Sequence, residues 1–472
     1  MWLNEQRYKE QSFFRQTAQT QQQKKDGILN LAFCLGQDPN YFLYSTLDRD
    51  STSAQASLLL PSLVLRFLSL KSGAMSDSKK SIGWGYLPDE ILTHIFTFLP
   101  IKSIIICASV SKTWKSLIKN PTFISTHLHH SHNKSQNLFL LLNISRNDRE
   151  VYTLHKEDDD PDFTEYASFD SPFHGPHLRH PHHNVVGTCN GLLCLSDGSP
   201  YFAKELFLWN PCVRKLLQFP IPRDTFNTHG LFQASFGFGF DPKTNDYKVV
   251  RILSIFGGSP LDFGKSRHVV EVYSLFAGEW RMLSASDSLP LTYAIISSGP
   301  PAFANGALHW IAFSNDNKQF VLVFDLGDEV FRQILLPELP SYTEGMMWTR
   351  VSVYGNSIAG FQRREGSGPM NIWVMKEYGV ASSWTKFSYQ CPSLGMLRPC
   401  PVGFRRNGEV VLEDNRIGEA VLLNDRRGLI SWNPDSQDVK NLEINGSHKT
   451  FFGSFVESLV LLDKATKGVV TY

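Results

Sequence analysis

The chain has 472 residues, enough for two or three domains or for one small domain beside a large repeat architecture. Its formal charge of +1 gives no electrostatic support for binding nucleic acid or an anionic membrane, since such proteins normally carry a strongly basic surface. The seven cysteines form no Cys-x-x-Cys pair and no signal peptide opens the chain, so we expect reduced thiols and a location in the cytoplasm, the nucleus or both.

Residues 1–80 do not have the pattern of a folded domain. They include the polar run QTQQQKK and an apolar stretch of 14 residues, 57–70, which contains a proline and an arginine. A membrane-spanning helix needs about 20 apolar residues, so we expect no membrane span here. We hypothesise that residues 1–80 are disordered, with Met75 as a real or alternative initiator and 1–74 as an unstructured or spurious extension. N-terminal peptide mass spectrometry that found 1–74 at full abundance would contradict this.

Residues 81–130 carry the helical part of the pattern. Pro88 suits the first turn of a helix, where its missing N–H group costs nothing, and the two acidic residues after it suit the positive end of the helix dipole. Apolar residues then recur at helical spacing until Pro100 ends the helix. A second helix is expected from about Lys102, and a third within SKTWKSLIKN at 111–120.

These three short helices carry more large apolar side chains than about 45 residues can bury by themselves. A contiguous apolar surface in a soluble chain usually marks a site for a partner protein, so we expect this segment to bind one. The stretch LPDEILTHIFTFLPIKSIIICASVSKTWKSLIKNPTFISTHL resembles an F-box over the whole module. The matching positions are Leu87-Pro88, Ile91, Leu92, Leu99-Pro100, Val110-Ser111-Lys112, Trp114 and Leu117-Ile118, with mild departures at Ile104-Ile105 and Cys107.

This resemblance implies docking on a Skp-family adaptor of an SCF ubiquitin ligase and, through the adaptor, association with a cullin. Some of the matching residues must pack inside the module, and the sequence does not sort them from those that meet the adaptor. The candidate adaptor-binding residues are Leu87, Pro88, Ile91, Leu92, Ile95, Leu99, Pro100 and Trp114.

Two other interpretations of the helices stay open. They would form an N-terminal cap on the domain that follows, or a three-helix unit that reads DNA. Lys112, Lys115 and Lys119 line one side of the third helix, as a DNA-binding unit would need. Three lysines at helical spacing are more often a solvated face, and no arginine or asparagine pattern for reading bases accompanies them. We therefore expect no nucleic-acid partner.

Residues 131–472 predict an all-β domain built from repeats. Short apolar or alternating runs are separated by Gly, Asn, Asp and Pro, without a long helical period. Asn-Gly or Asn-Ser corners fall at positions 190, 305, 356 and 407, and the last three are 51 residues apart. Trp209-Asn210-Pro211 recurs as Trp432-Asn433-Pro434 at the matching place in its own unit.

A period near 50 residues with about four strands per unit is typical of a kelch-like β-propeller. Five units are visible from 185 to about 445, and the strands at 137–154 and 451–462 supply a sixth blade shared by both ends of the domain. Such sharing would close the ring and remove its edges. We expect about six blades, with five to seven compatible with the pattern, and an α+β multidomain chain overall.

This β region resembles the F-box-associated interaction domain of plant F-box proteins. The phrases that carry the resemblance are VVGTCNGLLCL, LWNP, FGFDPKTNDYKVV, VEVYSL, NGALHW and FDLGDEVF, so that with the F-box it covers about 86–472. It implies a domain that recruits the protein to be ubiquitinated. The target itself is unknown from the sequence.

Several patterns imitate other sites. GGSPLDFGKS at 257–266 nearly spells a phosphate-binding loop, but one residue too many separates its glycines and a strand follows it, which favours a hairpin loop. Histidines gather at 127–132 and 174–183 without the Cys or carboxylate partners of a closed metal site, and we interpret both as exposed linker or insert loop. The glycines of FGFGF at 236–240 indicate a close backbone approach rather than a dinucleotide site.

The hypothesis for function is a non-catalytic substrate-recognition subunit of an SCF-type ubiquitin ligase, with no catalytic residue, metal or cofactor. Neither Gly-x-Ser-x-Gly nor His-Glu-x-x-His occurs in the chain. Two alternatives stay open. The chain would be an F-box scaffold that binds the adaptor without a cullin, or a propeller enzyme with converging acidic or metal-binding residues at one mouth of the ring.

Overall fold

In the computed structural model, residues 1–118 and 119–472 form two compact units, which are described one at a time. Several sequence predictions lie outside the described residues: the disordered segment 1–80 with Met75, Leu87, the acidic run 157–162, the loop 257–266, and His174, His177, His180 and His182. The structure describes residues 88–132, 138–146, 149–156, 163–173, 183–197, 205–222, 232–255, 267–283, 294–295, 300–314, 318–337, 346–364, 370–389, 399–414, 428–445, 450–464 and 469–471.

The described part of the first unit consists of three helices, α4 (Asp89–Thr97), α5 (Ile101–Val110) and α6 (Lys112–Ile118). Pro88 precedes α4 in an extended conformation, and its carbonyl accepts the first hydrogen bonds of the helix. Pro100 plays the same part at the start of α5. The Ser111 side chain caps α6 by accepting a bond from the Trp114 N–H at 3.1 Å. The three helices therefore begin where the sequence places its prolines and serine.

A fourth helix, α7 (Pro121–His132), belongs to the second unit. Asn120 caps it by accepting a bond from the Thr122 N–H at 2.9 Å. The interpretation of the first histidine cluster as a linker is wrong, because these histidines lie on α7, where His127 is buried while His129 and His132 are exposed. His183 of the second cluster is also buried rather than exposed. A helix that alternates His with Phe, Ile and Leu buries one face, and the composition alone suggested a polar loop.

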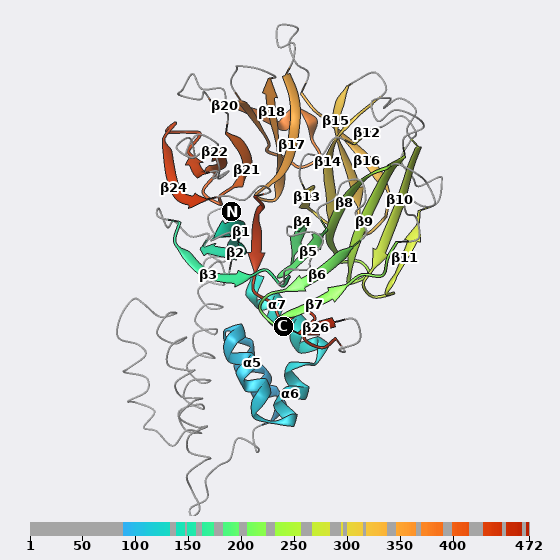
Figure 1. Ribbon diagram of the computed structural model, residues 1–472, viewed down its shortest axis with the longest axis vertical. Helices are drawn as coiled ribbons and strands as arrows, with labels where there is room; N and C mark the ends of the chain where they lie inside the picture. Colours follow the sequence, from blue (N-terminus) through green and yellow to red (C-terminus); the bar gives the residue numbers. More distant parts are fainter. Residues whose placement is uncertain are drawn as a thin grey trace, which may run out of the picture. The chain divides into compact units, whose positions relative to one another are not determined.

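The second unit is a β-propeller of six antiparallel sheets, which follow one another around a ring in Figure 1. Blade 1 is β25 (Phe452–Val456), β1 (Leu138–Arg146), β2 (Arg149–Lys156) and β3 (Glu165–Asp170). Blade 2 is β4 (Asn184–Cys189), β5 (Leu192–Ser196), β6 (Leu206–Asn210), β7 (Lys215–Gln218) and β26 (Val469–Thr471). Blade 3 is β8 (Phe232–Asp241), β9 (Asp246–Ile255), β10 (Arg267–Ser274) and β11 (Glu279–Met282).

The other three blades repeat this arrangement. Blade 4 is β12 (Ala294–Ile295), β13 (Ala302–Ala304), β14 (Ala307–Phe313), β15 (Gln319–Asp325) and β16 (Phe331–Leu335). Blade 5 is β17 (Met346–Tyr354), β18 (Ser357–Arg364), β19 (Met370–Met375) and β20 (Trp384–Tyr389), with a short 3₁₀ helix at Ala381–Ser383. Blade 6 is β21 (Cys400–Phe404), β22 (Val410–Asp414), β23 (Gly428–Trp432) and β24 (Val439–Asn445). The expected fold class, a small helical module followed by a propeller of about six blades, is confirmed.

The ring closes through the end of the domain, as the repeat pattern predicts. Strand β25 pairs antiparallel with β1, so residues 452–456 complete the blade that residues 138–170 begin. Strand β26 then pairs with β7 at the outer edge of blade 2. Each closing strand supplies main-chain partners to a strand that would otherwise present an open edge.

Two of the predicted corners are tight turns with both central residues in the left-handed region. Asn190 and Gly191 have φ angles of 52° and 77°, and Asn305 and Gly306 have 51° and 72°. This is the type I′ geometry that joins two strands by two residues, and Asn-Gly is its preferred sequence. The Asn-Gly signal thus fixes where these inner strands fold back.

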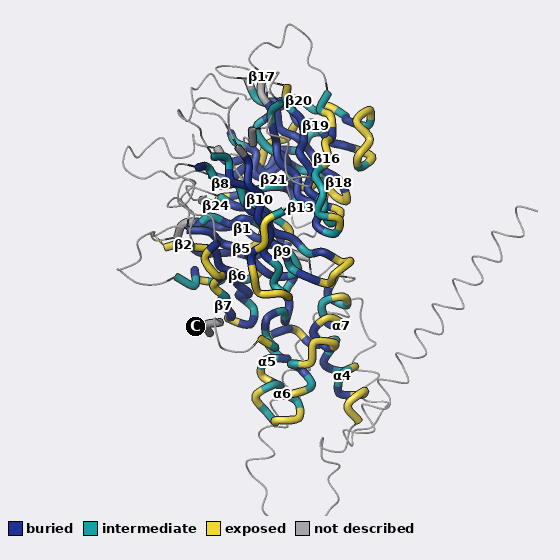
Figure 2. Tube along the Cα trace, turned by 90° about the vertical axis from the view of Figure 1, so that its right-hand side faces the viewer, coloured by how far each residue is buried: buried dark blue, intermediate teal, exposed yellow. Residues whose placement is uncertain are grey.

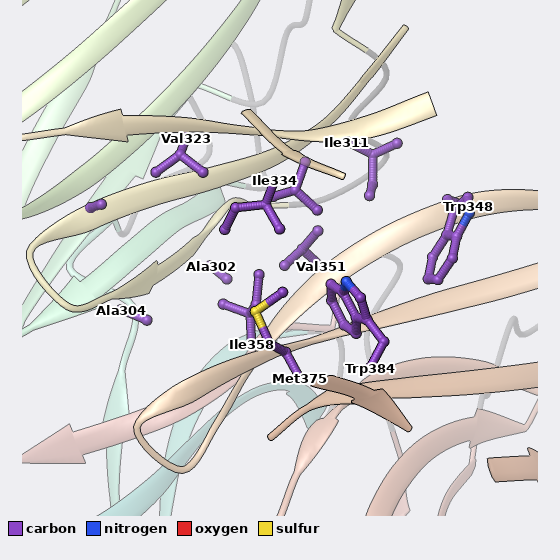
Figure 3. Packing of buried hydrophobic residues seen from close by; sticks show 12 residues of the cluster. Ala302, Ala304, Ile311, Val323, Ile334, Trp348, Val351, Ile358, Met375 and Trp384 are labelled. Atoms are coloured by element: carbon purple, nitrogen blue, oxygen red, sulfur yellow. The ribbon is translucent and has the colours of Figure 1, made fainter. Parts of the chain in front are cut away.

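The hydrophobic core is divided into clusters between neighbouring blades, as Figure 3 shows for blades 4 and 5. There Ile311, Val323 and Ile334 of blade 4 face Trp348, Val351 and other residues of blade 5. Among the described residues every neighbouring pair of blades shares such a cluster, including the pair formed by blades 6 and 1. In Figure 2 the strands are mostly buried, and exposed segments lie at turns and on helices. A single blade cannot bury both faces, so each blade depends on its neighbours for its core.

Glycines on the inner strands allow neighbouring blades to approach. A Cβ atom on Gly239 of β8 would lie 2.4 Å from the Phe303 ring, and one on Gly403 of β21 would lie 2.4 Å from the Phe452 ring. Both rings come from the inner strand of the next blade. The FGFGF run therefore marks a close approach of the backbone to a side chain of the adjacent blade.

Among the described residues no helix is long and apolar enough to cross a membrane.

Candidate functional site

Helix α4 presents two neighbouring arcs of apolar side chains with different exposure. Leu92, Phe96 and Leu99 are buried, and Phe96 packs edge-on against Trp114 with ring centroids 5.1 Å apart. Ile91 and Phe98 lie on the adjoining arc and are 49% and 47% exposed. Residues three and four positions apart share one side of a helix, so Pro88, Ile91, Ile95 and Phe98 form a continuous stripe.

The structure sorts the candidate residues that the sequence leaves unsorted. Leu92 and Leu99 are buried, while Ile95 and Trp114 are partly buried. Pro88, Ile91 and Pro100 are exposed, and Leu87 lies outside the described residues.

Sequence reasoning missed two exposed apolar residues. Phe98 is one, although it belongs to the helical pattern, and Ile106 of α5 is the other at 45% exposure. The sequence feature that could have identified them is that α4 and α5 carry more large apolar residues than two short helices can bury. We call the stripe Pro88, Ile91, Ile95 and Phe98 on α4 the exposed apolar face.

Two large side chains of the exposed apolar face, Ile91 and Phe98, are each about half exposed. Ile and Phe side chains each contribute about 1.5–3 kcal/mol when they pass from water into an apolar contact. Asp89 and Glu90, which follow Pro88 in the first turn of α4, are exposed as well. An apolar centre with a charged rim is the usual composition of a protein-binding surface.

The propeller carries a second candidate site, a channel of about 610 Å³ between its inner strands. Its lining comes from β4, β13, β17, β21 and β25, together with His132 at the end of α7. Aromatic residues from these strands line it beside three arginines, Arg350, Arg405 and Arg406, and the described lining contains no Asp or Glu. This volume lies within the range of ligand-binding pockets.

His132, the last residue of α7, lies in the lining of the channel. Its Nε2 atom lies 3.0 Å from Oδ1 of Asn190, in the turn between β4 and β5. The Asn190 amide in turn donates to the Tyr247 hydroxyl at 3.2 Å. The burial of Tyr247 raises its pKa, so the hydroxyl stays protonated and neutral at physiological pH.

Other buried polar groups serve packing. His309 on β14 is fully buried, and burial lowers its pKa to about 4. Its Nδ1 atom donates to the Ala302 carbonyl at 3.0 Å, which leaves Nε2 to accept from the Tyr378 hydroxyl at 2.8 Å. Among the residues that the structure describes, no group of three or more His, Cys, Asp or Glu side chains is placed to hold a metal ion.

Comparison with known families and proteins agrees with this architecture. Residues 84–126 match the F-box domain, and residues 142–462 match the F-box associated beta propeller domain. The Arabidopsis thaliana F-box protein At3g07870 is 27% identical over 80% of this chain and 93% of its own length. F-box protein CPR1 of the same plant is 28% identical over 80% of this chain and 89% of its own length. The Arabidopsis F-box/kelch-repeat protein At3g23880 is 25% identical over 71% of this chain and 87% of its own length.

Proposed function

Because the chain belongs to the plant F-box proteins with an F-box associated β-propeller domain, we propose that it is the substrate-recognition subunit of an SCF-type ubiquitin ligase. In this proposal the F-box docks on a Skp-family adaptor, and the adaptor links it to a cullin. The propeller binds the protein to be ubiquitinated. We place this activity in the cytoplasm, the nucleus or both.

The observation that carries the proposal is the exposed apolar face of α4 within an F-box. Ile91 and Phe98 are each about half exposed on one stripe of α4, while the neighbouring arc is buried. A helix that has already filled its own core has no internal use for a second apolar arc. A partner protein that covers this arc removes it from water, and the hydrophobic effect then supplies the binding energy.

The chain would act through proximity rather than through chemistry of its own. Thioester transfer to a target lysine would take place in the cullin-bound machinery, and the propeller would hold the target nearby. Tethering raises the effective concentration of the target lysine to the millimolar range for short connections. F-box proteins are adaptor or receptor subunits, which fits a non-catalytic role for this chain.

The test is capture of a purified Skp-family adaptor by the full chain. We expect the Ile91→Ser/Phe98→Ser variant to bind about several hundredfold more weakly, since two apolar anchors at the centre of an interface each contribute about 2 kcal/mol and a factor of ten corresponds to about 1.4 kcal/mol. The double variant Leu87→Ala/Pro88→Ala should weaken capture in the same direction. Phe276→Ser is the matched control, because Phe276 is 88% exposed on a propeller turn.

Each outcome has a distinct meaning. Equal capture by the wild type and by Ile91→Ser/Phe98→Ser would show that this stripe does not face the adaptor. Absence of capture by a folded wild type would remove the proposal and favour a helical cap. Capture of the adaptor without recovery of a cullin from plant extract would support the scaffold alternative instead of a ligase subunit.

A further inference from the structure

The channel of the propeller has an unbalanced charge. Arg350, Arg405 and Arg406 line it, and no carboxylate belongs to its described lining. The whole chain is almost neutral, with a formal charge of +1, so this concentration of positive charge is local. A cavity lined by one sign of charge attracts ligands of the opposite sign, because its low-dielectric walls concentrate the field.

The three arginines differ in how far their charge is already compensated. Arg405 is buried and pairs with Glu409, with 2.7 Å between its Nη1 and the carboxylate Oε2. Its guanidinium also lies 5.1 Å from the centre of the Phe163 ring. Glu409 accepts a further bond from the Ser431 hydroxyl at 2.6 Å. Arg405 is therefore a neutralised, structural part of the wall.

The charge of Arg350 is less well compensated by neighbouring carboxylates than that of Arg405. Arg350 lies on the inner strand β17 beside a bulge, and its Nη1 donates to the carbonyl of Pro401 on the next blade at 3.3 Å. Among the described residues no carboxylate lies within 4 Å of it, and Glu413 influences it only from farther away. Burial lowers the pKa of Arg350 to about 10, which leaves it charged at physiological pH. An arginine has five N–H donors, so most of its capacity is available to a ligand.

Arg406 and His132 also belong to the lining of the channel. Arg406 is exposed in the turn that joins β21 and β22, and His132 ends α7 beside Asn190. The lining also includes Phe303, Tyr354 and Phe451. Aromatic walls of this kind suit the side chains of a peptide, in addition to the anionic group that the arginines would bind.

We propose that the channel binds an acidic segment of the target protein, whose carboxylate or phosphate group pairs with Arg350 while Arg406 attracts it. The planar guanidinium group matches carboxylate and phosphate oxygens through two parallel hydrogen bonds. Arg350 is partly buried, and a charge-assisted bond at a partly buried site is stronger than one at a fully exposed site. The volume of about 610 Å³ accommodates a few side chains of an extended segment. This inference rests on the proposed function, because it names the class of target that the propeller selects.

The test measures binding of short fluorescein-labelled Gly–Ser peptides to the full chain by fluorescence polarisation. The peptides differ only in a central run of Glu, phosphoserine or Gln. At least one anionic peptide should bind about tenfold or more tightly than the Gln peptide, as expected for a charge-assisted hydrogen bond. The Glu and phosphoserine peptides distinguish a carboxylate-binding from a phosphate-binding channel.

Arg350→Gln should weaken the preferred peptide about tenfold, and Arg406→Gln should weaken it less because that residue is exposed. Arg332→Gln is the matched control, since its side chain is 60% exposed on the outer strand β16. Should Arg350→Gln fail to fold, Arg350→Lys keeps the charge but loses the paired hydrogen bonds, and it should give an intermediate loss. Circular dichroism of each variant confirms that it is folded.

Equal binding of the Glu, phosphoserine and Gln peptides would overturn the inference. An equal loss in Arg332→Gln and Arg350→Gln would also overturn it, because bulk charge would then explain the binding. Adaptor capture is measured on the same preparations. A chain that captures the adaptor but shows no anionic preference refutes the channel proposal alone, and the reverse result refutes the ligase proposal alone.

Discussion

The buried lysine between blades 3 and 4 offers a sharp test of how the ring is held together. Lys248 of β9 donates from Nζ to Asp241 Oδ2, to the Leu326 carbonyl and to Glu329 Oε1, each at 2.8 Å. Asp241 ends β8 in the same blade and is fully buried, whereas Leu326 and Glu329 lie between β15 and β16 of the next blade. One ammonium group thus joins two blades.

The perturbation is Lys248→Met, which keeps the length of the side chain and removes its charge. Breaking a buried ion pair by removal of one partner costs about 3–5 kcal/mol, because the other charge is left uncompensated. Asp241 still accepts bonds from the Lys243 N–H at 2.9 Å and from the Thr244 hydroxyl at 2.5 Å. We therefore expect a loss near the lower limit, about 3 kcal/mol of unfolding free energy.

The assay is urea unfolding followed by tryptophan fluorescence, with hydrogen exchange at β9 and β15 to localise the effect. A ring of six blades need not unfold in one step, so the exchange data show whether blades 3 and 4 separate first. The double variant Lys248→Met/Asp241→Asn should recover part of the loss, because it removes the unpaired carboxylate.

The matched control is Lys376→Met, an exposed lysine in the turn after β19, for which we expect a change within about 0.5 kcal/mol. A loss below about 1 kcal/mol for Lys248→Met would refute the reasoning. A double variant no more stable than the single variant would do the same, since the cost would then not come from an unpaired Asp241.

Gly403→Ala should lower the unfolding free energy by about 1–3 kcal/mol, measured by urea unfolding, because the new methyl group would lie 2.4 Å from the Phe452 ring. Burial lowers the pKa of His309 from 6.5 to about 4. Between pH 6.5 and 4 the unfolded chain therefore binds a proton at His309, whereas the folded chain does not. The free energy of unfolding is therefore highest above pH 6.5 and falls by about 3 kcal/mol in total as the pH drops to 4. His309→Gln should make the melting temperature depend less on pH over this range. Asn210→Ala should cost about 1–3 kcal/mol and speed proteolytic cleavage near residue 460, because the Asn210 amide donates to the Val460 carbonyl at 2.8 Å.

Each of these predictions has a control or a contrary outcome. Gly278→Ala is the control for Gly403→Ala, because nothing lies within 4 Å of its new methyl group and only the backbone cost of a positive φ remains. A larger loss of unfolding free energy in Gly278→Ala than in Gly403→Ala would contradict the packing argument. An unchanged pH profile in His309→Gln would show that another group causes the acid loss. Unaltered cleavage of Asn210→Ala would show that the end of the domain is held by other contacts.

The repeat and the approximate number of blades were accessible from the sequence because they depend on local, repeated signals. Asn-Gly at 190 and 305 can adopt left-handed φ at both positions with little strain, so each pair marks a hairpin without reference to the rest of the chain. The recurrence of Trp209 as Trp432 identifies the third strand in two blades. The closure of the ring by residues 452–456 followed from the need to leave no open edge.

The sequence was less informative where the answer depends on which face of an element meets another element. It listed Leu92 and Ile91 alike as adaptor candidates, and only the packing of α4 shows that Leu92 is buried and Ile91 exposed. It placed the histidines near 127–132 in a linker, whereas they lie on α7. Helical periodicity defines a face, but the neighbouring helix decides which part of that face is covered.

The charge of the channel was invisible to sequence reasoning for a related reason. Arg350 and Arg406 are separated by 56 positions, and their approach depends on the ring that brings β17 and β21 together. A near-neutral total charge gave no hint of a local excess. By itself the sequence determined the module order, the repeat and the turns, since these rest on local backbone preferences and apolar periodicity. The tertiary structure alone decided which apolar residues face solvent and which arginines share a cavity, because both depend on contacts between residues far apart in the chain.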